Sequence, residues 1–587
     1  MLKLLKQLNK REYGMVFLST VFIALQVGLE LKIPDYMTQI TSALETSGST
    51  AGDILKPGGI MLALSIISMA SAIIVGYFAA RLAAGFSARI RGKVFNQVMA
   101  YTTEDINHFS IPSLLTRSTN DITQIQVFVA MGMQVMIKAP ITAVWAITKI
   151  ADRGWQWTVA TACAVVFLAI VLTIILTLVQ PRFKIVQKLT DKLNQTTREN
   201  LSGLRVVHAF NAEKFQNDKF ETANDHLTST NLFANRVLAL MNPVMTLVSN
   251  GLTLAVYAIG AVLINNAALG AGRLTLFSNM IVFSSYAMQV IMSFLLLSII
   301  FVILPRVTVS AGRINSVLDI QPSIKYVTKT EGRSEEKGTV EFKDVSFKFA
   351  GADADAIEHL SFKAERGQTI AFIGSTGSGK STILNLLSRQ YEVTSGEILI
   401  DGINLNAYTE TDLNDKLGYI PQKAVLFSGT IRSNIDFGEN GNHAGKMSDD
   451  TIKTALETAQ ADFVAEDERG LNAPVAQHGD NFSGGQKQRL AIARAIAREP
   501  EILMFDDSFS ALDYATDRKL RDALRKNCRT TTKLIVAQRI GTIMDADQIV
   551  VLDNGKVEGK GTHRELLKDN KIYQEIAYSQ LSKEELA

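Results

Sequence analysis

Long apolar stretches without a single charge fill the first half of the chain. They lie at 13–29, 57–80, 154–181, 237–272 and 274–305, and a sixth at 122–148 is interrupted only by Lys138. Because a helix needs about 20 mostly apolar residues to cross a bilayer, this pattern predicts six transmembrane helices. We extend the first past Glu30 and Lys32 to Pro34. The last two runs, which lie next to each other, exclude a wholly water-soluble protein.

Three charged residues, Glu30, Lys32 and Lys138, fall inside these predicted helices. A charge in hydrocarbon is costly, and many such charges serve a function. We favour the simpler interpretation that all three lie near helix ends or face a water-filled cavity. Other polar residues in the runs either line a pathway or bond between helices, and the second role is the commoner one; they are Gln26, Gln134, Asn242, Asn250, Asn279 and Gln289.

The loops between the predicted helices are of two kinds. Segments 81–121 and 182–236 are long and carry 5 and 9 Lys and Arg, whereas 38–56, 149–153 and 265–273 carry 1, 2 and 1. Since basic residues stay on the cytoplasmic side, the long loops are predicted to be cytoplasmic and to contain extensions of the helices. Six crossings then put both termini in the cytoplasm, in a multi-pass protein of the plasma membrane. The basic start at 1–11 is typical of a helix on the inner membrane surface or of a frayed terminus.

The second half of the chain has a different pattern. A polar, charged stretch at 318–338 indicates a linker, and short apolar runs with strand character follow it at 339–344, 369–373, 398–400, 502–505, 534–537 and 549–552. Amphipathic helical stretches separate several of these runs, which is typical of an α/β domain. The predicted organisation is therefore an α-helical membrane domain at 1–317, the linker, and an α/β domain at 339–587.

Composition narrows the chemistry only a little. The 60 basic and 57 acidic residues give a net charge of +3, which makes nucleic acid a poor candidate partner. Two cysteines, Cys163 and Cys528, and seven scattered histidines show neither a disulfide framework nor the spacing of metal ligands.

A phosphate-binding loop follows the predicted strand at 369–373. The run Gly374-Ser-Thr-Gly-Ser-Gly-Lys380-Ser381 fits G-x-x-x-x-G-K-[ST] and leads into a predicted helix, whose N-terminus favours anions. Lys380 would reach the β- and γ-phosphates of ATP, and the Ser381 hydroxyl would bind Mg²⁺. The predicted ATP-binding set in this loop is Gly374, Ser375, Thr376, Gly377, Ser378, Gly379, Lys380, Ser381 and Thr382.

A second strand, at 502–505, ends in Asp506-Asp507. An apolar strand that ends in a carboxylate beside a phosphate-binding loop is the Walker B arrangement, with Asp506 as a ligand of Mg²⁺. Between the two motifs lies Phe482-Ser483-Gly484-Gly485-Gln486-Lys-Gln-Arg489. This run resembles the signature of ATP-binding-cassette (ABC) proteins.

The resemblance implies further roles for residues that match the family's motifs. Ser483, Gly484, Gly485 and Gln486 would face a γ-phosphate bound by another subunit. Phe349 occupies the position that stacks on adenine, and Gln422 matches the Q-loop that contacts Mg²⁺ and the membrane domain. Asp513 matches the D-loop. Segments 199–210 and 107–126 look like the coupling segments of the second and first cytoplasmic loops of ABC exporters, so the resemblance covers nearly the whole chain and implies a half-transporter.

Two positions at the predicted reaction centre depart from the family pattern. ABC ATPases normally carry Glu directly after the Walker B Asp, and here that residue is Asp507, one methylene shorter. The switch histidine of the family is replaced by Gln538, which cannot become cationic. Gln477 also stands where exporters usually carry Glu. Together these changes indicate a site that holds ATP and hydrolyses it slowly.

The signature, in contrast, is intact. ABC nucleotide domains pair head to tail, so a homodimer would contain two impaired sites, whereas a heterodimer would contain one impaired site and one built from the partner's P-loop and this signature. The pattern resembles the degenerate-site subunits of heterodimeric bacterial ABC exporters, many of which are multidrug pumps. The implied cofactors are ATP and Mg²⁺, and the implied partners are a second half-transporter, the bilayer and a small hydrophobic or amphipathic substrate. A lipid or peptide exporter subunit and an ATP-binding regulatory subunit stay open as alternatives.

Overall fold

The structure is a computed structural model that describes residues 2–45, 50–151, 154–267, 271–332, 335–438, 446–582 and 584–586. Parts of four predicted connecting segments lie outside this range, namely 46–49, 152–153, 268–270 and 333–334. The chain forms two compact units. One comprises Met1–Met99 and Phe109–Ile320, and the other Ala100–His108 and Gln321–Ala587.

The described part of the first unit contains helices and the short connections between them. Its elements are α1 (Leu2–Leu5), α2 (Lys10–Glu45), α3 (Ala51–Met99), α5 (Ile111–Ser118), α6 (Asn120–Val127), a π-helical turn (Phe128–Gly132), α7 (Met133–Ala151), α8 (Trp155–Ser202), α9 (Leu204–Ala209), α10 (Glu213–Ala239), α11 (Met241–Asn266) and α12 (Ala271–Asp319). Among the described residues, six helical runs are long and apolar enough to cross a membrane, in agreement with the predicted number.

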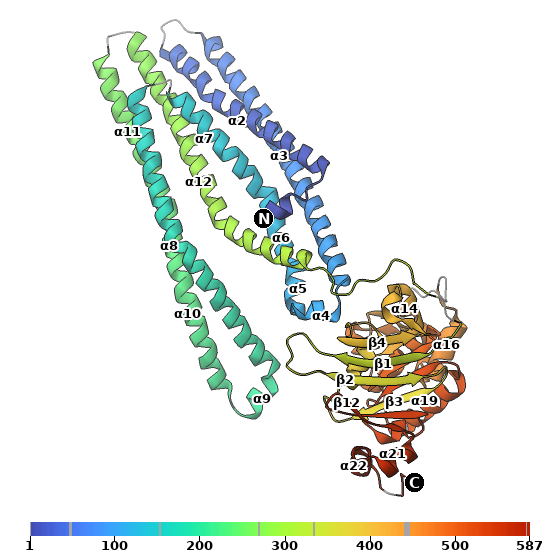
Figure 1. Cartoon of the computed structure of the whole chain (residues 1–587). Helices are drawn as coiled ribbons and strands as arrows, with labels where there is room; N and C mark the ends of the chain where they lie inside the picture. The colour runs from blue at the N-terminus through green and yellow to red at the C-terminus, as the bar shows by residue number, and fades with distance from the viewer. Residues whose placement is uncertain are drawn as a thin grey trace. The chain divides into compact units, whose positions relative to one another are not determined.

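Several of these helices are much longer than a bilayer is thick. At 1.5 Å per residue, the 49 residues of α3 span about 74 Å, against about 30 Å of hydrocarbon. The long helices α8 and α10 run side by side and are joined at one end by the short α9, as Figure 1 shows. The helix α9 falls inside the predicted second coupling segment at 199–210.

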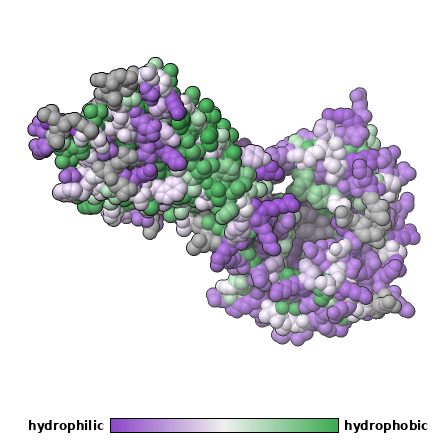
Figure 2. Space-filling view, turned by 90° about the horizontal axis from the view of Figure 1, so that it is seen from above, coloured by the Kyte–Doolittle hydropathy of each residue, from purple (hydrophilic) through white to green (hydrophobic). Residues whose placement is uncertain are grey.

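The packing of the helical unit is suited to a lipid environment. Its buried cluster includes Trp157 and Phe283, whose ring centroids lie 5.6 Å apart, and the Tyr286 hydroxyl donates to the Leu31 carbonyl. Many large apolar side chains stay on the outside, where Figure 2 shows hydrophobic colour over this unit and mostly hydrophilic colour over the other. Since lipid is as apolar as leucine, such residues need no burial inside the protein.

The structure refines three expectations about the helical unit. Glu30 and Lys32 lie well inside α2, and Lys138 lies inside the helical run that ends at Ala151, so of the two predicted settings, near a helix end or facing a water-filled cavity, the first does not apply. Residues 1–11 do not form one helix, because α1 ends at Leu5 and α2 begins at Lys10. The first coupling segment is predicted at 107–126. The helix of this loop that packs with the other unit is α4 (Thr103–Asn107), which lies almost entirely before that segment.

The second unit contains two main sheets. An antiparallel sheet has the order β2-β1-β4-β5, and a six-stranded sheet has the order β12-β11-β3-β10-β9-β6, in which only β12 is antiparallel. The strands are β1 (Val340–Phe347), β2 (Ile357–Ala364), β3 (Thr369–Gly374), β4 (Ser395–Ile400), β5 (Ile403–Asn404), β6 (Leu417–Ile420), β9 (Ile502–Asp506), β10 (Thr532–Val536), β11 (Gln548–Asp553) and β12 (Lys556–Gly561), and a small pair is formed by β7 (Gly429–Thr430) and β8 (Pro474–Val475). All six predicted strand runs overlap observed strands.

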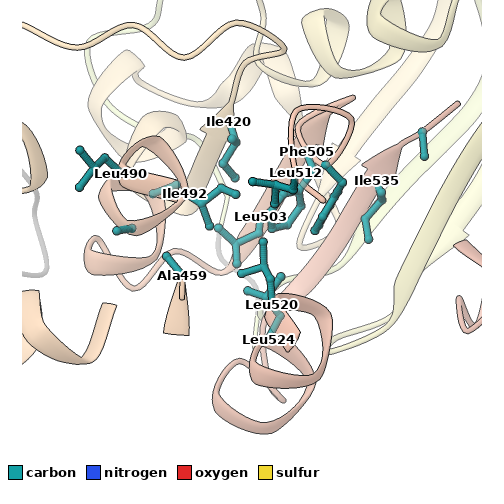
Figure 3. Packing of buried hydrophobic residues seen from close by; sticks show 14 of the residues in the cluster. Ile420, Ala459, Leu490, Ile492, Leu503, Phe505, Leu512, Leu520, Leu524 and Ile535 are labelled. Atoms are coloured by element: carbon teal, nitrogen blue, oxygen red, sulfur yellow. The ribbon is translucent and has the colours of Figure 1, made fainter. Parts of the chain in front are cut away.

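Helices complete this unit. They are α13 (Lys380–Leu387), α14 (Glu410–Lys416), α15 (Ile431–Ile435), α16 (Asp449–Thr458), α17 (Phe463–Glu466), α18 (Gly484–Ala497), α19 (Tyr514–Asn527), α20 (Ile540–Ile543), α21 (His563–Asp569) and α22 (Lys571–Gln580). Side chains alternate across the large sheet, so Leu503 and Phe505 enter one buried cluster while Met504 enters the other. Figure 3 shows the first cluster, in which Leu503, Phe505 and Ile535 of the strands meet leucines of α18 and α19.

Candidate functional site

The carboxyl ends of four parallel strands bring the predicted site together. Val536 of β10 is in register with Phe372 of β3 and with Asp506 of β9, and Ile420 of β6 is in register with Phe505. The residues that directly follow these strands must therefore lie at one edge of the sheet. They are the phosphate-binding loop, Asp507, Gln538 and the segment that carries Gln422, and this edge is where open α/β sheets bind ligands.

The conformation of the phosphate-binding loop requires glycine at two positions. Gly379 has a φ of +91°, and a Cβ there would lie 2.5 Å from the Ile357 side chain. A Cβ at Gly374 would lie 2.0 Å from the Leu552 carbonyl oxygen. Any side chain at these positions would force the loop away from β11 and β2. The loop leads directly into α13, whose first amides favour a bound phosphate.

Lys380, the first residue of α13, turns back over the loop. Its Nζ donates to the carbonyl oxygens of Gly374 at 3.0 Å and Ser375 at 2.7 Å. Burial lowers the pKa of this ammonium, and the carboxylates of Asp507 and Asp506 oppose that shift. The side chain thus lies within the ring of backbone groups that the motif is expected to place around phosphate oxygens.

Oxygen ligands suited to Mg²⁺ lie beside the loop. The Ser381 hydroxyl donates to Oδ1 of Asp506 at 2.6 Å, and the Tyr419 hydroxyl donates to Oδ2 of the same carboxylate at 3.3 Å. A hydroxyl and a carboxylate this close fit a hard cation that prefers oxygen. Ser381 and Asp506 would hold the ion, which neutralises charge on the β- and γ-phosphates when bound.

Asp507 is held by two side-chain amides. Its Oδ2 accepts from Nε2 of Gln422 and from Nε2 of Gln538, each at 3.0 Å. The carboxyl group can only accept while ionised, so the NH₂ groups of both amides must face it. The residue is 6% exposed, and this burial raises the pKa of its carboxyl group. Gln422 therefore contacts Asp507 in this structure, and its contact with Mg²⁺ stays a prediction.

The signature forms the start of α18. The Ser483 hydroxyl accepts from the Gln486 amide at 3.3 Å, while the Gln486 side chain accepts from the Ser483 amide at 2.9 Å. This capping box fixes the helix start. Ser483 and Gly484 are not buried, and none of the signature's hydrogen bonds in the described part of the chain reaches the phosphate-binding loop. The free amides of this helix N-terminus are thus open to an anion from outside the chain.

The signature helix and the D-loop are both tied to the sheet edge. Gln488 of α18 donates to the Pro421 carbonyl, directly before Gln422, at 3.1 Å. Asp513 caps α19 by accepting from the Thr516 amide, and this bond lowers the pKa of its carboxyl group. Arg539, next to Gln538, donates to the D-loop carbonyls of Leu512 and Ser510, each at 3.1 Å.

Phe349, the predicted adenine-stacking residue, lies in an aromatic cluster. It is 38% exposed, and its ring meets those of Phe347 and Tyr391 edge to face, with centroids 4.8 and 5.4 Å away. The Thr103 hydroxyl of α4 donates to the side chain of Gln390, the residue next to Tyr391, at 3.1 Å. The segment Ala100–His108 therefore packs within the nucleotide-binding unit next to the aromatic cluster.

Sequence reasoning missed several residues that support the site. Tyr419 contacts Asp506, Arg539 holds the D-loop, and Gln580 of α22 bonds to the Gln538 carbonyl at 2.8 Å and to the Ile540 amide at 2.9 Å. Tyr419 and Arg539 adjoin matched motifs, so their proximity was a usable signal. Gln580 had none, because it lies 42 residues away in a polar helix.

The fold and this edge define a class of protein: a helical membrane unit fused to a P-loop ATPase. The ABC transporter family profile matches residues 357–510, and the ABC transporter transmembrane region profile matches 16–294. An uncharacterized ABC transporter ATP-binding protein of Mycobacterium tuberculosis is 38% identical over 93% of both chains. YfiB of Bacillus subtilis, also described as an uncharacterized ABC transporter ATP-binding protein, is 32% identical over 90% of both chains.

A solved structure shows the same architecture. A bacterial Atm1-family ABC exporter with ATP bound superposes with a TM-score of 0.80 at 24% identity, over 98% of this chain and 100% of that one. The chain belongs to the ABC transporter family. It is an ABC transporter and a multi-pass plasma membrane protein, with a cytoplasmic domain that binds ATP to drive transport.

Proposed function

We propose that this chain is the subunit of a heterodimeric ABC exporter that carries the catalytically impaired ATP site. Its signature would complete the competent site of a second half-transporter. The transported compound would be a small hydrophobic or amphipathic molecule, as in multidrug efflux.

The environment of Asp507 carries this proposal. The residue that should polarise the attacking water has one carboxylate oxygen engaged by the amides of Gln422 and Gln538, each at 3.0 Å. Gln538 offers no titratable proton in place of an imidazole, and a positioned general base contributes roughly 10²–10⁴ in rate. The shorter side chain lowers the reach of the carboxylate by about 1.5 Å, a scale at which catalytic geometry is sensitive.

The signature supports the asymmetric part of the proposal. Ser483 and the first amides of α18 form a complete capping box at the surface, and Gly484 and Gly485 place no side chain over them. In a homodimer, this intact signature would face only the two impaired ATP sites of the same chain. In a heterodimer, it would complete the catalytically competent ATP site built on the partner's P-loop.

Comparison of the chain alone with its native complex tests the proposal. An affinity tag on this chain allows the complex to be purified from native membranes and the partner to be identified by mass spectrometry. We expect the complex to hydrolyse ATP about 100-fold faster than the single chain, in line with the loss of a general base in both homodimer sites. Retention of labelled ATP by the single chain is the control for folding.

Equal rates for the single chain and the complex would contradict the heterodimer. ATP-dependent uptake of a fluorescent amphiphile into inside-out vesicles that contain the complex separates an exporter from an ATP-binding regulatory subunit. A complex that hydrolyses ATP but moves no member of a broad amphiphile panel would contradict the proposed substrate class.

A further inference from the structure

A cluster of polar side chains lies inside the membrane-spanning part of the helical unit. Three donors converge on Oε1 of Glu30 in α2. They are Nε2 of Gln26 at 2.8 Å, the Ser68 hydroxyl of α3 at 3.4 Å, and Nζ of Lys138 in α7 at 3.1 Å. The Glu30–Lys138 ion pair thus joins α2 to α7, and the serine adds α3.

The spacing along the helices places this cluster within the hydrocarbon thickness. Lys138 lies about three helical turns before Lys149 on α7, and Ser68 lies about three turns after Lys56 on α3. At about 5.4 Å per turn, each separation is roughly 16–18 Å, or about half of a hydrocarbon core about 30 Å thick. The cluster is therefore well below the charged residues that mark the outer ends of these helices.

The ion pair is only partly covered. The side chains of Glu30 and Lys138 are 32% and 29% exposed, whereas Gln26 and Ser68 are buried. Because a charged group exposed to hydrocarbon is costly, we expect the open side of this pair to face water or another polar group. Among the residues that the structure describes, no hydrogen bond is made by Oε2 of Glu30.

The arrangement favours a positive ligand over a negative one. A cation can approach Oε2 while Gln26, Ser68 and Lys138 continue to hold Oε1. An anion would have to draw Lys138 away from Glu30 and leave a carboxylate without its counter-charge, which is strongly unfavourable within a membrane. The arrangement thus offers an organic cation a preformed acceptor at no cost to the existing bonds.

The same side of α7 also carries an aromatic side chain. Trp145 lies two turns from Lys138 on the same side of the helix, packs over Gly28 of α2, and keeps 40% of its surface exposed. A Cβ at Gly28 would lie 3.2 Å from the indole, so glycine makes room for the ring. Tryptophan is the side chain that best attracts cations through its π-face.

We propose that Glu30, braced by Gln26, Ser68 and Lys138, is a binding subsite for amphiphilic organic cations on the transport pathway. Suitable ligands carry a quaternary ammonium or phosphonium group on an apolar body. The inference rests on the proposed export of amphipathic compounds and narrows it to one charge class.

Tetraphenylphosphonium and tetraphenylborate are matched probes, because they have nearly the same size and shape and opposite charge. Saturable binding of each is measured on the native complex in nanodiscs, where no membrane potential exists, with empty nanodiscs as the blank. We expect the wild-type complex to bind the cation saturably and more tightly than the anion.

Opposite effects of two substitutions separate a binding role from a structural one. Glu30→Gln keeps the shape but removes the charge, and should raise the dissociation constant for the cation about tenfold or more. Lys138→Met removes a positive charge that repels a cationic ligand and should lower that constant. The neutral double variant Glu30→Gln with Lys138→Met avoids an unpaired charge and should lose cation binding as Glu30→Gln does. Asp35→Asn, in a second α2–α7 ion pair, is the matched control and should leave the constant nearly unchanged.

If the ion pair has only a structural role, Glu30→Gln and Lys138→Met should both weaken binding of the cation. That result would overturn the inference. Tighter binding of the anion, or no saturable cation binding by the wild-type complex, would do the same. Competition by phosphatidylcholine in the nanodisc would identify a lipid headgroup as a natural source of the same cationic chemistry. Since binding is read without hydrolysis, failure here leaves the ATPase comparison of complex and single chain unaffected, and the reverse also holds.

Discussion

The nucleotide-binding unit carries two surfaces that we propose meet ATP, and they differ in how their polar groups are used. At the sheet edge, Asp507 is buried and its Oδ2 is engaged by Gln422 and Gln538. At the start of α18, Ser483 and Gln486 satisfy each other and leave the following amides exposed. One surface has its reactive group restrained by neighbours, while the other is preorganised for a ligand. The comparison teaches that the two halves of an ABC site can be judged separately within one chain.

The largest expected effect comes from damage to the signature. In the proposed heterodimer, Ser483→Arg would add bulk between the nucleotide domains and remove a donor to the partner's γ-phosphate. Loss of one such donor costs about 10²–10³ in rate, so hydrolysis by the complex should nearly stop. Steady-state ATPase measures the loss, and labelled-nucleotide retention should show that this chain's own loop still binds.

Ser483→Thr is the matched control for that variant, because threonine keeps the capping hydroxyl. Its complex should retain most of the activity. A loss equal to that of Ser483→Arg would indicate that any change at this helix start is fatal, and the comparison would lose its meaning.

Restoring the sheet edge should have the next largest effect. Asp507→Glu with Gln538→His returns the missing methylene and an imidazole, and should raise hydrolysis at this site at least about tenfold. The measurement needs a complex whose other site is disabled, so that only this site is read. Each single substitution is a control, since the two groups should act together. No gain would place the cause of slow hydrolysis in the partner's signature.

A smaller effect is expected from Lys380→Ala. The substitution removes the buried ammonium from the phosphate-binding loop and should weaken ATP binding at this site. Turnover of the complex should fall only about fivefold, because the chemistry proceeds at the other site and is affected through closure of the domains. If this variant is as damaging to turnover as Ser483→Arg, the two sites are not unequal.

The smallest expected effect concerns Mg²⁺. Tyr419→Phe removes one long hydrogen bond to Asp506, 3.3 Å in length, and leaves the Ser381 contact intact. Such a bond is weak, so the Mg²⁺ concentration that half-saturates nucleotide retention should shift about twofold. Ser381→Ala is the comparison and should shift it much more. A larger effect for Tyr419→Phe would make the phenol, rather than Ser381, the main support of Asp506.

The sequence predicted those features that depend on local pattern. The six spans follow from runs such as 237–272, and the meeting of loop, Asp506 and Gln538 follows from apolar strands that end in polar residues. Among the strands it missed, β2, β6 and β12 have polar or short sequences whose pairing depends on neighbours. Strand character there is decided by the sheet and not by the segment.

Contacts between distant residues could not be predicted from pattern. The bonds of Gln422 and Gln538 to Asp507 join residues 85 and 31 positions apart, and Glu30 meets Lys138 across 108 positions. Each residue could be named as a candidate from its type and place. Which of them meet depends on how helices and strands pack, as the corrected position of Glu30 shows.

The division of the chain also has a consequence for synthesis. The segment Ala100–His108 belongs to the unit that resumes only at Gln321, after the whole of Phe109–Ile320 has been made. At about 5–20 residues per second, the ribosome needs roughly 10–40 s to cover that interval. During that time α4 has been made but the strands and aromatic residues that receive it have not. The nucleotide-binding unit is thus completed by a piece that leaves the ribosome early and waits through the insertion of four membrane helices.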